Sequence, residues 1–226
     1  MPREPDRRNA LIAAEAKAMA LFDAIERARL IRPGRREREV ERDIYALAEQ
    51  EFCVTKHWHK RIVRTGANTL TIARDNPPIR TIGAHDIVYV DLGPVFEMWE
   101  ADVGRSYVMG DDSVKKSLVC DLPRVFQRVQ AHYQASTTIT GADLFAYAEK
   151  VAEEFGWRFG GLIAGHIVSE FAHAQIPGDK NLNRIGPANA RPMHEPDALG
   201  RERHWILEIH LVDRAHRFGG FYERLL

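Results

Sequence analysis

Apolar residues recur at helical spacing in two stretches near the start of the chain. From Asn9 to Leu30, Ala, Leu and Ile alternate with charged residues without a breaker, which predicts an amphipathic helix ending before Pro33-Gly34. A second helix is predicted from about Arg36 to Glu51, with an apolar stripe at Val40, Ile44, Leu47 and Ala48. Residues 1–8 carry no such pattern, and we expect them to be disordered.

The pattern then changes to short apolar runs separated by turn residues, which is typical of β-strands. The run Ile87–Val90 is wholly apolar and leads directly into Asp91, as expected of a buried strand that ends in a polar residue. The other strands of this region are predicted at Lys60–Arg64, Val95–Trp99 and Gly104–Met109.

The second half of the chain repeats the order of helices followed by strands. One helix is predicted to begin near Asp112 or Asp121, with Pro123 in its first turn, and another runs from an N-cap at Thr140 to Phe155. A strand carrying His166, a polar loop over 177–201 and strands at His204–Val212 and Phe218–Leu225 follow. Two successive sets of helices and strands predict an α+β fold, although no sequence repeat is evident.

Composition narrows the class of protein. A length of 226 residues with 45% hydrophobic residues predicts one domain, 1–226. Lys+Arg and Asp+Glu both number 32, so a strongly basic nucleic-acid-binding surface is not expected, and no apolar run approaches the roughly 20 residues of a membrane span. Two cysteines, Cys53 and Cys120, cannot build a disulfide framework, so we expect a cytoplasmic protein.

Four carboxylates in apolar strand contexts, together with one histidine, are the candidates for chemistry. An ionised carboxylate in a buried strand is unfavourable unless it is paired or bound to a metal. A surface strand end explains any one of them alone, but not the whole set. Two divalent cations would balance four negative charges, and oxygen ligands with one imidazole favour Mn, Fe, Co or Zn. The set is Asp91, Asp102, His166, Glu208 and Glu223.

The order and spacing of these motifs resemble the pita-bread metallopeptidases (family M24), which include methionine aminopeptidase, Xaa-Pro aminopeptidase, prolidase and creatinase. The resemblance covers nearly the whole chain. It is carried by Ile31–Gly34 with Glu37–Glu39, the Gly-x-Asn turn in Arg64–Thr69, Val90–Gly93 followed by Asp102 and Arg105, Gly165-His166 with His173, Leu207-Glu208, and Gly220–Glu223.

The resemblance implies two related α-β halves around a curved antiparallel sheet, without the separate N-terminal domain of prolidase. It implies that Asp91 binds one metal ion, that His166 and Glu208 bind the other, and that Asp102 and Glu223 bridge the two. Metal-activated water would be the nucleophile. Glu208 would pass its proton to the leaving amine, and His173 would donate a hydrogen bond to the substrate carbonyl.

The chain departs from the peptidases on the substrate side. A histidine usually follows the Gly-x-Asn turn, but this chain has Thr71, Ile72 and Ala73 there, and Leu162 replaces a histidine found four residues before the metal histidine in aminopeptidase P. His59 is a candidate to compensate as a substrate contact, alongside His173. The 177–201 loop is a candidate lid.

Three functions remain open at this stage. The first is a metal-dependent hydrolase of a peptide or small amide C–N bond, similar to Xaa-Pro aminopeptidase. The second is a creatinase-like hydrolase or lyase acting on a small non-peptide substrate. The third is a non-enzymatic binding protein on the same fold. A homodimer is possible in each case, since a second protomer could cover the pocket.

Overall fold

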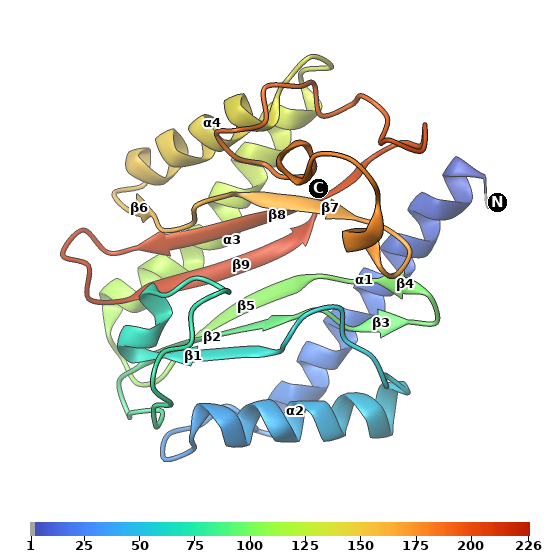
Figure 1. Cartoon of the computed structure of the whole chain (residues 1–226). Coiled ribbons are helices and arrows are strands. Elements are labelled where there is room, and N and C mark those ends of the chain that lie inside the picture. Colours follow the sequence, from blue (N-terminus) through green and yellow to red (C-terminus); the bar gives the residue numbers. More distant parts are fainter. Residues whose placement is uncertain (1–2) are drawn as a thin grey trace.

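Seven strands form one antiparallel sheet in the computed structural model, which describes residues 3–226. The strand order is β1-β2-β5-β9-β8-β6, and β7 also pairs with β8 (Figure 1). A separate small hairpin consists of β3 (Val95–Phe96) and β4 (Trp99–Glu100). The strands of the sheet are β1 (Ile62–Thr65), β2 (Ile87–Leu92), β5 (Val103–Val108), β6 (Arg158–Phe159), β7 (Gly165–Val168), β8 (His204–Val212) and β9 (Gly219–Leu225).

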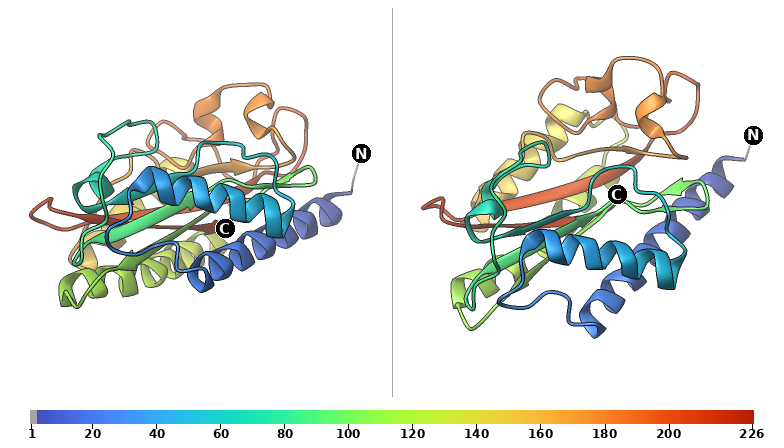
Figure 2. Two further views of the ribbon diagram at one scale, coloured as in Figure 1. Left: turned by 90° about the horizontal axis from the view of Figure 1, so that it is seen from below. Right: turned by 60° about the horizontal axis from the view of Figure 1, so that its bottom comes forward.

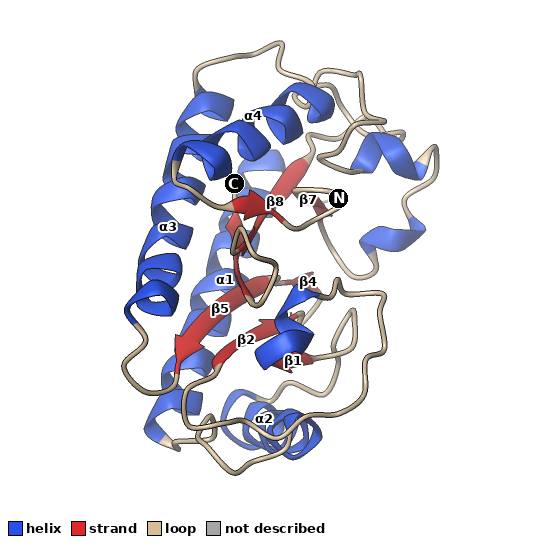
Figure 3. Cartoon of the chain, turned by 90° about the vertical axis from the view of Figure 1, so that its left-hand side faces the viewer, coloured by secondary structure: helices blue, strands red, loops and turns tan. Residues whose placement is uncertain are grey.

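Helices cover one face of this sheet. They are α1 (Glu4–Arg27), α2 (Glu37–Phe52), α3 (Ser113–Gln134) and α4 (Gly141–Glu154). Helices α1 and α3 lie behind the strands, whereas the long loops lie on the opposite face (Figures 2 and 3). Apolar side chains of α1 and α2 form one core cluster with β2 and β5, and those of α3 and α4 form another with β8. The functional groups must therefore lie on the loop-covered face.

The two halves of the chain meet between β5 and β9. Gly104 of β5 pairs in register with Glu223 of β9. Beyond it, the Ser106 hydroxyl bridges the strands, because its Oγ accepts from the Phe221 N–H at 2.7 Å and donates to the Phe221 carbonyl at 2.9 Å. Two helix-and-strand halves around one antiparallel sheet confirm the predicted α+β class.

The N-terminal prediction needs correction. We expected residues 1–8 to be disordered, but α1 begins at Glu4, and Met1 and Pro2 lie outside the described residues. The reason is tertiary contact, because the Arg7 side chain is buried and its guanidinium forms an ion pair with Glu4 at 2.7 Å. Acidic residues in the first turn also favour this helix end.

Of the two predicted starts of the third helix, the one near Asp112 is confirmed. Asp112 caps α3 by accepting hydrogen bonds from the backbone of Val114 and Lys115, so Pro123 lies inside the helix rather than in its first turn. The predicted cap of α4 is confirmed, since Thr140 Oγ1 accepts from the Asp143 N–H at 3.1 Å. Over residues 3–226, no helix combines the length and the hydropathy that a membrane-spanning segment requires.

Candidate metal centre

Three of the predicted ligand residues lie in one row across the sheet. Asp91 of β2 is opposite Gly104 of β5, which in turn is opposite Glu223 of β9. Glu223 is opposite Glu208 of β8. Residues paired in register point to the same face, so the three carboxylates converge on the face away from the helices. Gly104 contributes no side chain to this row, and the Phe221 ring packs over it, since a Cβ there would lie 2.5 Å from the ring.

Asp102 lies at the middle of this group, and each of its oxygens faces a different imidazole. Its Oδ1 is 3.2 Å from Nε2 of His59, and its Oδ2 is 3.0 Å from Nε2 of His166. In both histidines, Nδ1 lies against the carbonyl of the next residue, at 2.6 Å for Lys60 and 2.8 Å for Ile167. A carbonyl only accepts, so Nδ1 carries the hydrogen, and Nε2 of the neutral ring offers a lone pair to a metal.

The two glutamates complete the group from the second half of the chain. Glu208 Oε1 is 3.7 Å from His166 Nε2. Among the described residues, Glu223 Oε2 is buried without a hydrogen-bond partner. A buried carboxylate oxygen without a partner is unfavourable, and oxygen donors with imidazole are ligands of divalent cations. Two overlapping donor sets, each with its atoms within 4.8 Å of one another, share Asp102: His59/Asp91/Asp102 and Asp102/His166/Glu223.

Burial changes the proton affinity of the carboxylates. It raises the pKa of Asp91 and that of Glu208 to about 7, because both are removed from water and lie near other acids. Burial and the neighbouring Asp102 raise the pKa of Glu223 well above its ordinary value. Without a cation, these groups therefore hold protons near neutral pH, and a metal ion would displace them.

The pKa values of Asp102 and of the two imidazoles beside it shift in the direction opposite to the one that burial alone would cause. Although burial opposes it, hydrogen bonds from His166 and His59 lower the pKa of Asp102 to about 2. Burial also opposes charge on the two rings, but the adjacent carboxylates raise the pKa of His59 and that of His166 to about 9. Without a metal ion, the two imidazoles thus supply positive charge to the site, and a metal ion would displace the Nε2 proton of each ring that binds it.

His173 lies beside the centre and is held by Glu100. The buried Glu100 carboxylate accepts from the His173 backbone N–H at 3.0 Å and pairs with its Nδ1 at 2.5 Å. The His173 ring stacks on His166 with 5.2 Å between centroids, and Trp58 packs edge-on against both rings. Glu100 does not engage Nε2 of His173, but His173 is not among the residues that line the cavity over the carboxylates.

A cavity of about 490 Å³ opens over the carboxylates. All five predicted ligands line it. Ile72 and Leu162 line its apolar wall, at the two positions where the resemblance to the peptidases would lead one to expect histidines. Arg74 and Arg184 add cationic groups. The cavity therefore combines a carboxylate and imidazole floor, apolar walls and nearby positive charge.

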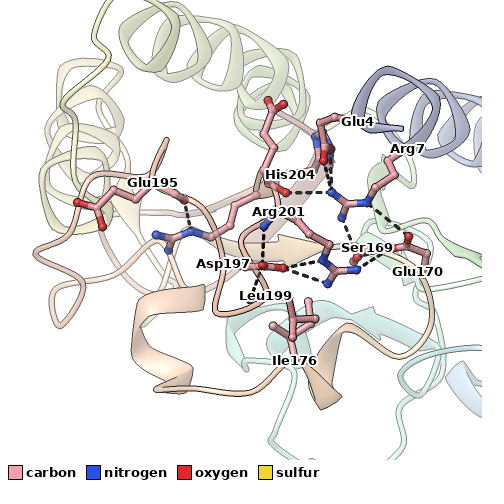
Figure 4. Close-up of polar contacts among 12 residues, drawn as sticks. Glu4, Arg7, Ser169, Glu170, Ile176, Glu195, Asp197, Leu199, Arg201 and His204 are labelled. Atoms are coloured by element: carbon pink, nitrogen blue, oxygen red, sulfur yellow. Dashed lines mark hydrogen bonds and ion pairs between the residues drawn. The ribbon is translucent and has the colours of Figure 1, made fainter. Parts of the chain in front are cut away.

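The loop after β7 is held by a polar network at the N-terminal end of α1 (Figure 4). Arg7 bonds to Ser169 Oγ at 3.2 Å and lies 3.4 Å from Glu170. Arg201 pairs with Asp197 at 3.0 Å and lies 3.4 Å from Glu170. Through Glu170, the end of the predicted lid region is thus linked to α1, and Arg184 of this region lines the cavity.

The sequence pattern of "Metallopeptidase family M24" matches residues 9–198. The chain belongs to this family. The predicted resemblance to the pita-bread metallopeptidases is thereby confirmed. No curated protein sequence matches the chain significantly.

Solved structures share the M24 fold at low sequence identity. A prolidase from Thermococcus sibiricus has a TM-score of 0.72 and 20% identity, covering 98% of this chain and 56% of its own. An X-Pro aminopeptidase from Thermotoga maritima has a TM-score of 0.72 and 19% identity, covering 99% and 58%. A methionine aminopeptidase from Rickettsia prowazekii has a TM-score of 0.69 and 13% identity, covering 96% and 90%. The chain thus spans just over half the length of the first two relatives and most of the third.

The five candidate ligands came from the resemblance noted in the sequence, which gave no indication of the residues around them. The structure brings all five predicted ligands together, and it brings His59 into contact with two of them. Trp58 and Glu100, which orient the histidines, were not anticipated. An acid following an apolar strand could have drawn attention to Glu100, but its bond to His173 crosses 73 residues of sequence.

Proposed function

We propose that this M24 chain is a hydrolase that uses two divalent metal ions to cleave a peptide or small amide C–N bond, as Xaa-Pro aminopeptidases do. The observation that carries the proposal is the position of Asp102. Each of its oxygens faces its own imidazole, and further carboxylates flank both sides. A carboxylate used on both oxygens is suited to join two cations.

The ligand shell would divide between the halves of the chain. Asp91 would hold one ion, His166 and Glu208 the other, and Asp102 and Glu223 would bridge them. When bound, the ions would polarise the substrate carbonyl and lower the pKa of water towards neutrality. The unpartnered oxygen of Glu223 and the raised pKa of Glu208 support this assignment.

Two side chains would act on the substrate. Glu208 lines the cavity and would accept a proton from water and return it to the leaving amine. The Glu100 carboxylate accepts from Nδ1, so Nε2 of His173 would donate to the substrate carbonyl when both ring nitrogens carry hydrogen. The Glu100 carboxylate would thereby fix the orientation of the His173 ring and balance its positive charge.

The cavity supports a substrate of dipeptide size. Its volume of about 490 Å³ lies in the usual range for small-molecule sites, and Arg184 could pair with a terminal carboxylate. The exposed thiols of Cys53 and Cys120 support a cytoplasmic, reducing location. We retain a homodimer as part of the proposal, since a partner could close the mouth of the cavity.

The direct test is hydrolysis by protein that has been stripped with a chelator and reloaded with Mn²⁺, Co²⁺ or Zn²⁺. We expect two ions per chain and metal-dependent cleavage of Xaa-Pro or other dipeptides. Glu208→Gln should reduce kcat on the order of 100-fold or more, since it removes the proton acceptor with little change of shape. Glu154→Gln, at a surface ion pair on α4, is the matched control.

Two results would contradict the proposal. If reloaded protein takes up no ions at micromolar concentrations, the chain belongs with non-enzymatic binding proteins on this fold. If it takes up metal but cleaves nothing in a panel of dipeptides and amides, hydrolysis of these bonds is excluded.

A creatinase-like reaction on a small non-peptide substrate is the second candidate. Ile72 and Leu162 favour it, because apolar side chains line the cavity where the peptidases present histidines. A panel of guanidino and quaternary-amine osmolytes discriminates between the two. Turnover of such a compound without turnover of any dipeptide would establish the second candidate.

A further inference from the structure

His59 does not belong to the five-residue ligand set that the M24 resemblance implies, yet it lies inside the centre. Its Nε2 is 3.3 Å from Asp91 Oδ1 and 3.2 Å from Asp102 Oδ1. Ligands about 2.1 Å from one ion, at tetrahedral or octahedral angles, lie about 3.0–3.4 Å apart. His59 Nε2 therefore lies at the spacing of a neighbouring ligand from each of these two oxygens, and the donor atoms of the three residues all lie within 4.8 Å of one another.

We propose that the imidazole of His59 is a ligand of the metal ion held by Asp91 and Asp102. The inference rests on the proposed two-metal function. It gives each ion one nitrogen ligand, His59 on one side and His166 on the other, with Asp102 between them.

The match between the two histidines supports this assignment. Each directs Nδ1 to the carbonyl of the following residue, and each directs Nε2 to a separate oxygen of Asp102. Such a second bond from the far ring nitrogen is the usual way in which proteins orient metal-binding histidines. Since both of its nitrogens are engaged, His59 has none left for the substrate contact that we had expected of it.

The backbone holds His59 in this position. The segment that precedes it runs beside the turn after β2, where the Trp58 N–H donates to Gly93 O at 2.9 Å and the Val95 N–H donates to Lys56 O at 2.9 Å. Gly93 makes room for the ring, because a Cβ there would lie 2.3 Å from the His59 imidazole and 2.5 Å from Trp58 Nε1. A side chain at position 93 would push the histidine out of the centre.

The second nitrogen changes the expected metal preference. A position ligated only by carboxylates favours Mn²⁺ or Mg²⁺, whereas an imidazole strengthens the binding of Co²⁺ and Zn²⁺. We therefore expect both equivalents of Zn²⁺ to bind wild-type protein with similar affinity. Loss of His59 should weaken one equivalent on the order of 10- to 100-fold and leave the other unchanged.

Zinc titration and X-ray absorption of the Zn²⁺-loaded protein test the assignment without an activity assay. With both equivalents of zinc bound, wild type should show on average one imidazole per zinc, and His59→Ala should show half of that. His57→Ala is the matched control, since His57 precedes it by two residues and stacks on Tyr45 outside the centre. In His59→Gly, added imidazole should restore the weakened equivalent. If circular dichroism shows that these variants are misfolded, His59→Gln replaces them.

The outcomes separate this inference from the proposed function. If wild type binds two zinc ions and the His59 variants keep both affinities and the imidazole count, the His59 assignment is overturned and the two-metal proposal stands. If wild type fails to bind two ions, both fall.

Discussion

Glu208 of β8 lies directly opposite Glu223 of β9 in the antiparallel register. Like charges in such a pair are destabilising, and here both side chains are largely buried. A sheet tolerates this pair only if protons or cations compensate the carboxylates. The free energy of unfolding should therefore depend on pH and on bound metal ions.

Protein stripped of metal should lose stability as pH rises from about 5 to about 9. Folded Asp91 and Glu208, with pKa values of about 7, keep protons that the unfolded chain has released, so their stabilising contribution is lost as pH rises through about 7. The histidines His59 and His166, raised from 6.5 to about 9, stabilise the fold below pH 6.5 and lose this contribution as pH rises through 9.

Urea denaturation at several pH values, with a chelator and with Zn²⁺, measures this effect. Added metal should reverse the slope, because its ligands must be deprotonated. A stripped protein whose stability is flat or rises between pH 6 and 9 would contradict the assignment of these shifts.

Gly104→Ala should damage the centre through packing alone. The new Cβ would lie 2.5 Å from the Phe221 ring and 3.1 Å from Glu223 Cβ, so we expect a loss of about 1–3 kcal/mol in unfolding free energy and weaker metal binding. The double variant Gly104→Ala/Phe221→Leu, which removes the aromatic ring, should recover part of both. Thermal denaturation and metal titration provide the measurements, and an undisturbed Gly104→Ala protein would refute the prediction.

Arg184→Ala should affect substrates that carry a free terminal carboxylate. The residue lines the cavity, and loss of a charge-assisted hydrogen bond should raise KM about tenfold for a dipeptide. The corresponding dipeptide amide, which lacks the anion, should be cleaved with unchanged KM. An equal effect on both substrates would show that Arg184 does not bind the carboxylate.

Arg7→Ala should loosen the loop that follows β7. Its removal leaves Glu170 and Glu4 without their buried cation, which should lower the unfolding free energy by about 1–3 kcal/mol. Limited proteolysis should then cut within residues 170–203 sooner than in wild type. The exposed neighbour Arg8 on the same helix offers the control Arg8→Ala, and equal protection of both variants would argue against an anchoring role for Arg7.

The sequence was sufficient for features that rest on local pattern. The apolar run before Asp91 and the strands flanking Glu208 and Glu223 are visible as alternating or continuous hydrophobic stretches, and the structure has strands there. The Thr140 cap was predictable because it depends on a residue only three positions away.

Features that depend on distant contacts were not predictable. The charged segment at the start of the chain becomes helical because Arg7 binds residues 162 or more positions away, Ser169 and Glu202 among them. His59 reaches Asp102 across 43 residues of sequence, and the space for its ring depends on the absence of a side chain at Gly93. Spacing alone gives no measure of such proximity.

The narrow pairing between β5 and β9 has a mechanical implication. Asp91 in β2 and Asp102, directly before β5, lie on one side of this junction, whereas His166, Glu208 and Glu223 belong to the strands β7, β8 and β9 on the other. Cations bound among these residues would link the two halves close to the strand pair that joins them at Gly104 and Glu223. Removal of the ions should therefore weaken the association of the two halves.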